Sequence, residues 1–211
     1  MKQEQDIIHE LSSIKDMMQK SSRFISLSGL SGILAGVYAL VGAYLAQHIL
    51  QPFQHEYGYW INKDKVDIVT IKLFFIAVCV IGAASSTGIF LSYRKATKRG
   101  ESIWDYQAKR LMFNFLIPLV TGGLFALTLI YHNAVDFIAP CTLLFYGLAL
   151  IHASKYTLGT IRNFGYIQVL LGLLASVFLR NGILFMAIGF GGMHIIYGIY
   201  LYFKYDLKTN S

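Results

Sequence analysis

The chain has 211 residues, of which 55% are hydrophobic and only 14% are charged, and its mean hydropathy is +0.54. Soluble domains carry about a quarter of their residues as charged side chains, so this composition excludes a soluble globular enzyme. It also excludes a disordered chain or a disulfide scaffold, because aromatic residues make up 15% of the chain and there are only 2 cysteines. The sequence therefore predicts an integral membrane protein whose direct surroundings are the lipid bilayer.

Residues 1–24 are predicted to form a cytoplasmic amphipathic helix. An apolar stripe recurs there with the a/d spacing of a heptad, at Ile7, Leu11, Ile14 and Met18. One interpretation is a helix that lies on the membrane surface or against cytoplasmic loops. The other is a short coiled coil that holds two copies, or a protein partner, together. The segment has no apolar core of its own, so the first span is expected to act as an uncleaved signal anchor.

Six membrane-spanning helices are expected, because a span needs about 20 largely apolar residues. Residues 111–153 would form a helix of about 65 Å, twice the thickness of the bilayer hydrocarbon, and must fold back near His132, Asn133 and Asp136. Residues 164–203 must fold back in the same way at Arg180-Asn181-Gly182, where Asn-Gly favours a turn. The predicted spans are about 25–49, 67–92, 111–132, 135–153, 164–179 and 183–203, followed by a tail over 204–211.

The basic residues predict the orientation. In the six-span topology all but four of the 18 Lys and Arg residues fall on one side, together with both chain ends; the exceptions are Lys63, Lys65, Lys72 and Arg180. Basic loops remain in the cytoplasm, so both termini are predicted to be cytoplasmic, in a bacterial inner membrane. The formal net charge of +7 reflects these loops, and no nucleic-acid partner is expected.

Small residues are dense in the spans and predict close helix packing. Ser28, Gly32 and Gly36 recur every four residues in the first span, and the second contains a run of small residues from Gly82 to Gly88. Such patterns let helix backbones approach one another, within the chain or across a homo-oligomer interface. Cys79 and Cys141 lie inside the second and fourth spans and are expected to be small packing residues.

The stretch Ser21-Ser-Arg-Phe-Ile-Ser-Leu-Ser-Gly-Leu-Ser-Gly-Ile-Leu-Ala-Gly36 and the polar helix before it resemble the opening of an uncharacterised family of small multi-span bacterial membrane proteins. The resemblance is specific over the N-terminal fifth of the chain and extends loosely to the six-span layout. That family has no assigned activity, and its members look like companions of a small winged-helix transcription regulator. The resemblance therefore implies a regulatory or stress setting and assigns no site residue.

His194 is the main candidate for a polar site inside the membrane. It lies near the centre of the sixth span, and an ionisable residue at that depth is a functional hypothesis by default. A neutral imidazole can also be a core residue, hydrogen-bonded to Tyr38, Tyr197 or a backbone carbonyl. Asn114, four residues into its span, needs a partner on a neighbouring helix, and Pro118 is expected to kink that span. The candidate ligand or transport-pathway residues are His194, Asn114, Pro118, Gly191, Gly192 and Tyr38.

No cofactor is predicted, and a divalent metal at the outer face is a minority alternative. Its ligands would be His48, His55, His132 and Asp136, which come from three different segments. No H-E-x-x-H or G-x-S-x-G motif is present, and no catalytic residue is assigned.

The overall prediction is an all-α, six-span transmembrane bundle with a cytoplasmic N-terminal amphipathic helix. The leading hypothesis for its function is a non-enzymatic membrane protein that works through oligomerisation or a protein partner. A small-molecule or ion transporter with a polar site at His194 is the alternative. A lipid- or metal-dependent membrane enzyme comes third.

Overall fold

The computed structural model describes residues 28–54, 63–98, 104 and 106–206, and this part of the chain is helical without a strand. Within these described residues, six helices are long and apolar enough to cross a membrane, which confirms the predicted number of spanning helices and is typical of a multi-pass membrane protein. They extend beyond the predicted spans at most ends. The candidate spans are Gly29–Gln51, Ile68–Lys98, Tyr106–Tyr131, Val135–Tyr156, Thr160–Val177 and Leu179–Asp206. The predicted N-terminal helix, with Ile7, Leu11, Ile14 and Met18, lies outside the described residues.

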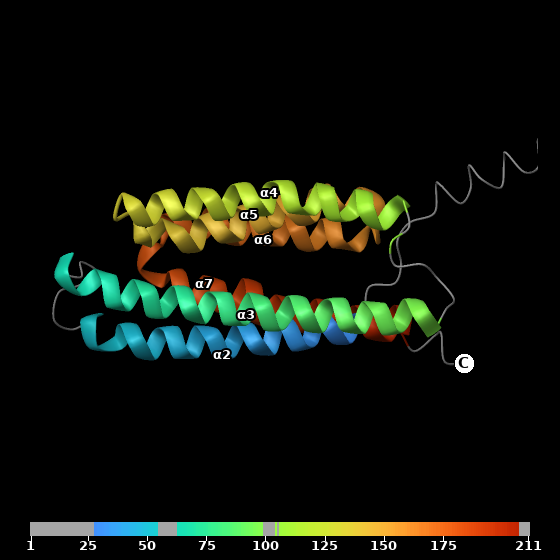
Figure 1. Cartoon of the computed structure of the whole chain (residues 1–211), viewed down its shortest axis with the longest axis horizontal. Helices are drawn as coiled ribbons and strands as arrows, with labels where there is room; N and C mark the ends of the chain where they lie inside the picture. The colour runs from blue at the N-terminus through green and yellow to red at the C-terminus, as the bar shows by residue number, and fades with distance from the viewer. Residues whose placement is uncertain (1–27, 55–62, 99–103, 105, 207–211) are drawn as a thin grey trace, which may run out of the picture.

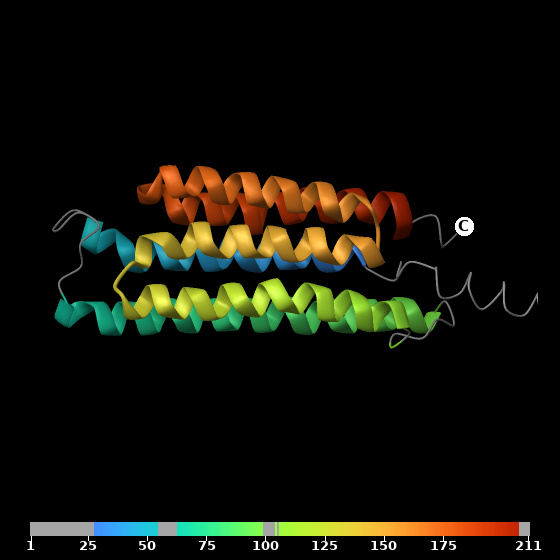
Figure 2. The same cartoon turned by 90° about the horizontal axis from the view of Figure 1, so that it is seen from above.

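The helices form two layers (Figures 1 and 2). One layer contains α4 (Tyr106–Tyr131), α5 (Ile138–Ala153) and α6 (Thr160–Val177), with α5 in the middle. The other contains α3 (Lys63–Lys98), α2 (Gly29–Gln54) and the last span, with α2 in the middle. That last span comprises the short η3 (Leu179–Asn181), α7 (Gly182–Met186), the π-helical η4 (Ala187–Gly192), α8 (Met193–Leu201) and η5 (Tyr202–Asp206).

The two layers meet where α5 and α6 pack on the last span. Figures 1 and 2 place α3 and α4 at the same edge of the molecule but in different layers. At this edge α3 packs on α2, and α4 packs on α5. The two layers are therefore joined at one side of the fold. At the outer edge, α3 and α4 each have a single principal neighbour.

Glycines on α2 allow the last span to pack against its backbone. A Cβ built on Gly36 would lie 2.7 Å from the Gly191 carbonyl oxygen, and one on Gly198 would lie 2.5 Å from the Ile33 amide nitrogen. A Cβ on Gly29 would collide with the backbone of Tyr202. The predicted small-residue pattern of the first span thus packs inside the chain. In contrast, a Cβ on Gly82 or Gly88 of α3 would meet open space.

Asn133 ends α4 at the place where the sequence predicts a break. Its φ of 56° is in the left-handed region, which Asn tolerates better than other non-glycine residues. The Asn133 amide donates to the Ile130 carbonyl, and the Ala134 amide donates to the Leu129 carbonyl. This is the Schellman arrangement that satisfies the last carbonyls of a helix, so the turn is stable without a glycine.

The second predicted break is near the right place, but the predicted mechanism is wrong. The helix α6 ends at Val177, and the chain turns at Phe178 (φ −108°, ψ 59°), before the Asn-Gly pair. Gly182 begins α7 with an ordinary helical φ of −52°. Its lack of a side chain serves packing instead, because a Cβ there would lie 3.0 Å from the Ala139 Cβ.

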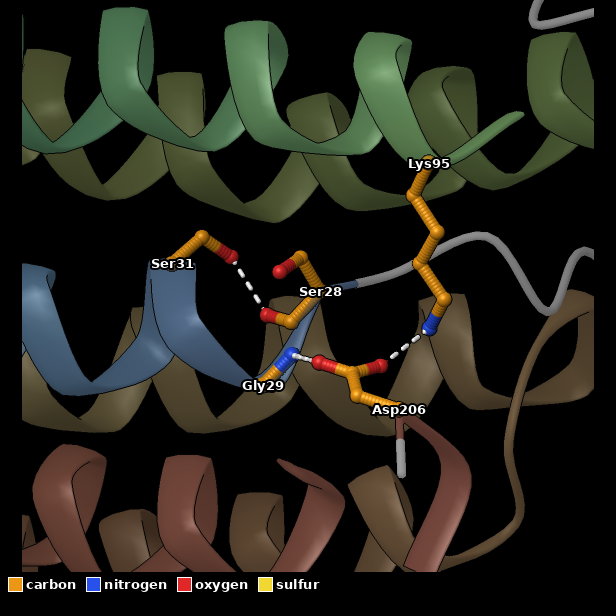
Figure 3. Close-up of polar contacts among 5 residues, drawn as sticks. All are labelled: Ser28, Gly29, Ser31, Lys95 and Asp206. Carbon is orange, nitrogen blue, oxygen red and sulfur yellow. Dashed lines mark hydrogen bonds and ion pairs between the residues drawn. The ribbon is translucent and has the colours of Figure 1, made fainter. Parts of the chain in front are cut away.

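Asp206 joins three helices at the end of the bundle where the described chain begins and ends (Figure 3). One carboxylate oxygen accepts a hydrogen bond of 2.9 Å from the Gly29 amide, and the other lies 2.6 Å from the Lys95 ammonium nitrogen. The first turn of α2 carries no acidic residue, so Asp206 supplies the negative charge that a helix N-terminus favours. The contact ties the start of α2 to the ends of α3 and the last span.

The two cysteines differ from each other. Cys141 is buried and its Sγ donates to the Gly122 carbonyl at 3.6 Å, as expected for a packing residue. Cys79 is exposed on α3, so its predicted role as a packing residue within the chain is wrong. The reason is that α3 buries one face only, against α2.

We predict that Gly198→Ala destabilises the fold by about 1–3 kcal/mol, because the new methyl group overlaps the backbone of α2. Gly123→Ala is the matched control, since a Cβ at Gly123 meets open space. Thermal unfolding in a mild detergent should show a lower midpoint for Gly198→Ala only. Equal midpoints for the two variants would contradict the glycine-mediated packing of α2 on α8.

Candidate functional site: a buried polar cluster between the layers

His194 is hydrogen-bonded through both ring nitrogens. Its Nδ1 lies 3.2 Å from the Gly189 carbonyl oxygen, and its Nε2 lies 2.7 Å from the Tyr146 hydroxyl on α5. A carbonyl can only accept, so Nδ1 carries the proton of the neutral imidazole. Nε2 is then the acceptor, and the Tyr146 hydroxyl donates to it. The side chain of His194 thus links the last span to the other layer.

The π-helical turn of η4 makes the Gly189 carbonyl accessible to side chains. In an α-helix the amide of Met193 would donate to Gly189, four residues earlier. Here the Met193 amide donates to the Ile188 carbonyl instead, five residues earlier. The Gly189 carbonyl accepts from the His194 ring and also from Nε2 of Gln168 at 2.7 Å. Such single π-helical turns are frequent at functional sites.

Gln168 on α6 is completely buried, and it brings the third helix into the cluster. Its Nε2 donates to Gly189, while its Oε1 has no hydrogen-bond partner among the described residues. A Cβ on Gly189 would lie 2.7 Å from that Oε1 and 2.6 Å from a methyl group of Leu143. Glycine is therefore required at position 189 for α5 and α6 to approach the last span this closely.

Aromatic rings enclose the polar cluster. Phe164 of α6 meets the His194 ring edge-on at 4.8 Å and stacks on Tyr197 at 4.8 Å with an interplanar angle of 4°. Phe190 lies 5.2 Å from the Tyr146 ring. The Tyr197 hydroxyl is 2.9 Å from the Thr160 hydroxyl, a second polar link between α8 and α6. The cluster is therefore shielded by rings, and its hydrogen bonds compete little with water.

Gln168 and Tyr146 were not among the residues predicted from sequence. The sequence could have indicated Gln168 as a polar site residue, since it is the only amide side chain between residues 164 and 179. It could not have indicated Tyr146, because tyrosines and phenylalanines are abundant in every part of the chain. Of the alternatives proposed for His194, the backbone carbonyl is the one that the structure shows.

The other predicted pathway residues do not gather around His194. The Tyr38 hydroxyl lies 3.3 Å from the Thr87 hydroxyl and links α2 to α3. Gly191 packs against Leu40 of α2, whereas a Cβ on Gly192 would meet open space. Asn114 donates to the Arg110 carbonyl of its own helix, and Pro118 lies within the same helix, which continues on both sides of it.

The predicted metal ligands form no site in the part of the chain that the structure describes. No three His, Cys, Asp or Glu side chains among those residues are close enough to hold one ion. His48 lies 6.5 Å from the Tyr44 ring, and His132 meets the Tyr131 ring at 5.2 Å. Asp136 lies in the short η1 helix (Val135–Phe137), and His55 is outside the described residues.

No family model, curated protein or solved structure matches the chain. The resemblance of residues 21–36 to an uncharacterised membrane family gains no support from these comparisons.

We predict that Tyr146→Phe lowers the free energy of unfolding by about 1–3 kcal/mol, because Nε2 of the half-buried His194 loses its donor. Tyr200→Phe is the control: Tyr200 is exposed, and its hydroxyl accepts from Lys204 at the surface. Thermal unfolding in detergent measures both. A Tyr146→Phe protein as stable as the Tyr200→Phe protein would show that this hydrogen bond does not hold the layers together.

Proposed function

We propose that this chain is a non-enzymatic inner-membrane protein that acts by associating with a second copy or a protein partner through the α3 and α4 edge. The observation that carries the proposal is the exposure of α3. Only 6% of the most apolar stretch of its span is buried, against 50% for the span Val135–Tyr156. Lipid can cover such a face. A helix that has one neighbour, and glycines with open space around them, is also suited to packing against another helix.

The composition of the exposed α3 face supports association over simple lipid contact. Gly82 and Gly88 have open space over their Cα atoms, and the Ser86 hydroxyl between them donates to the Gly82 carbonyl of its own helix. Bulky apolar side chains such as Ile81 and Ile89 are exposed on α3 as well. Between them, the small residues with internally satisfied hydroxyls leave room for another helix backbone to approach closely.

The proposed membrane orientation has both termini in the cytoplasm. The ends of α3, α5 and the last span, and the starts of α4 and α6, lie at the Asp206 end of the bundle in Figure 1. These ends carry Lys98, Lys109, Lys155, Arg162 and Lys204. Basic ends of membrane proteins favour the cytoplasm, so the proposal assigns this end and the N-terminal segment to the cytoplasmic side. A regulatory or stress setting follows only from the sequence resemblance.

The proposal predicts oligomers that persist in a bilayer. Fluorescently labelled protein in liposomes should show two or more photobleaching steps per particle when the protein is diluted far below one copy per vesicle. A variant lacking residues 1–20 separates the two possible contacts, because it retains the membrane edge and loses the heptad stripe. Single-step bleaching of the full chain, together with no cross-linked partner in its native membrane, would contradict the proposal.

A second candidate function is transport of a small molecule or ion past His194. The Tyr146–His194 hydrogen bond at mid-span is the observation that favours it. The engagement of both ring nitrogens favours a structural role instead.

If transport is the function, His194→Gln should abolish pH-dependent flux into liposomes while the protein remains folded. Val177→Gln, at an exposed position on α6, controls for the added amide. Equal flux in wild type and both variants, at the level of empty liposomes, would contradict the transport function.

A further inference from the structure

An exposed stripe on α4 has the spacing of a helix–helix interface. Its five residues recur at alternating intervals of three and four, the pattern with which two helices pack side by side. Ile117 is 51% exposed and Leu124 is 61% exposed, and the threonines are exposed as well. The face of α4 that packs on α5 is a different one, which contains Phe115 and Gly122. Asn114 is half-buried, and the other four residues are exposed. We call this set the α4 stripe: Asn114, Ile117, Thr121, Leu124 and Thr128.

Asn114, at the N-terminal end of the stripe, is its most polar residue, and its hydrogen-bonding capacity is only partly used. Its Nδ2 donates to the Arg110 carbonyl at 2.8 Å, which leaves a second N–H and the Oδ1 without a partner in the described part of the chain. Its backbone carbonyl also lacks the usual helical donor, because residue 118 is a proline and has no N–H. Two acceptors and one donor are thus concentrated at one half-buried position.

The depth of Asn114 makes these groups costly to leave in lipid. The Arg110 guanidinium lies over the Tyr106 ring at 4.9 Å and the Tyr156 ring at 5.5 Å, as is typical of side chains at the membrane interface. Asn114 is one helical turn further along α4, about 6 Å deeper. Hydrocarbon offers no hydrogen bonds, so a protein partner for this amide is favoured strongly over an acyl chain.

The threonine hydroxyls of the stripe do not need a hydrogen-bond partner outside α4. The Thr121 hydroxyl donates to the Ile117 carbonyl, and the Thr128 hydroxyl donates to the Phe125 carbonyl, both within α4. Their methyl groups and the side chains of Ile117 and Leu124 therefore present a mainly apolar surface. Asn114 is the one stripe residue whose hydrogen bonding requires a partner outside the helix.

We propose that the α4 stripe packs against the same stripe of a second copy of this chain, in parallel, with the two Asn114 side chains hydrogen-bonded to each other. The proposal rests on the proposed association and specifies its surface. In a dimer with a two-fold axis along the membrane normal, each residue lies at the same depth as the same residue of the other copy. An amide both donates and accepts, so Asn114 is complementary to itself at equal depth, and it also fixes the register of the two helices.

Substitution of Asn114 tests the paired amides. Asn114→Leu should weaken self-association in liposomes by about threefold to thirtyfold, the range measured for hydrogen bonds between membrane helices. Asn114→Gln keeps an amide and should retain most of the affinity. Because the Asn114 side chain bonds within its own helix, both variants are expected to unfold near the wild-type temperature in detergent. Equal affinity of the Leu variant and wild type would overturn the proposal.

Disulfide cross-linking locates the contact independently of affinity. In a chain with Cys79→Ser and Cys141→Ala, Thr121→Cys should form a disulfide-linked dimer on oxidation in native membranes. The reason is that, in the proposed dimer, each stripe position faces the same position of the other copy. Leu116→Cys, which is 42% exposed but on another side of the helix, should not.

Cross-linking at Gly82→Cys of α3, without cross-linking at Thr121→Cys, would overturn the α4 stripe and leave the proposed association intact. A wild-type chain that is monomeric in bilayers would overturn both.

Discussion

The Gly189 carbonyl is the hydrogen-bond acceptor on which the joining of the two layers depends. It accepts from His194 of its own span and from Gln168 of α6, while the same imidazole accepts from Tyr146 of α5. In a membrane interior these polar groups have no alternative partners, so their mutual pairing determines which helices meet. The π-helical turn makes the pairing possible, because it directs the Met193 amide to Ile188.

Joining the layers at this side has a consequence for the opposite edge. The glycine faces of α2 and the Asp206 contact hold the last span against α2, and α5 holds α4 and α6. The helices α3 and α4 are left with one principal neighbour each. The surface available for association is thus a result of where the chain places its buried polar side chains.

The sequence predicts the number of helices well, because bilayer thickness limits helix length and leaves only a few polar interruptions as turns. It also predicts the turn at Asn133, whose left-handed backbone suits the residue. It does not predict the partners of His194. Tyr146 is 48 residues away along the chain, and the free carbonyl arises from a π-helical turn that no residue type specifies. The sequence indicates that Asn114 needs a partner, and in the structure its Nδ2 donates to the Arg110 carbonyl of its own helix.

The central claim is that the exposed side of α4 is covered by protein and not by lipid in the membrane. Oxygen accessibility of nitroxide labels placed singly at residues 112–129 in lipid bilayers tests it most directly. The account predicts accessibility minima at positions 114, 117, 121, 124 and 128, and maxima at exposed positions on another side of the helix, such as Leu116 and Leu127. Uniformly high accessibility along the stripe would contradict it, because such labels would face acyl chains.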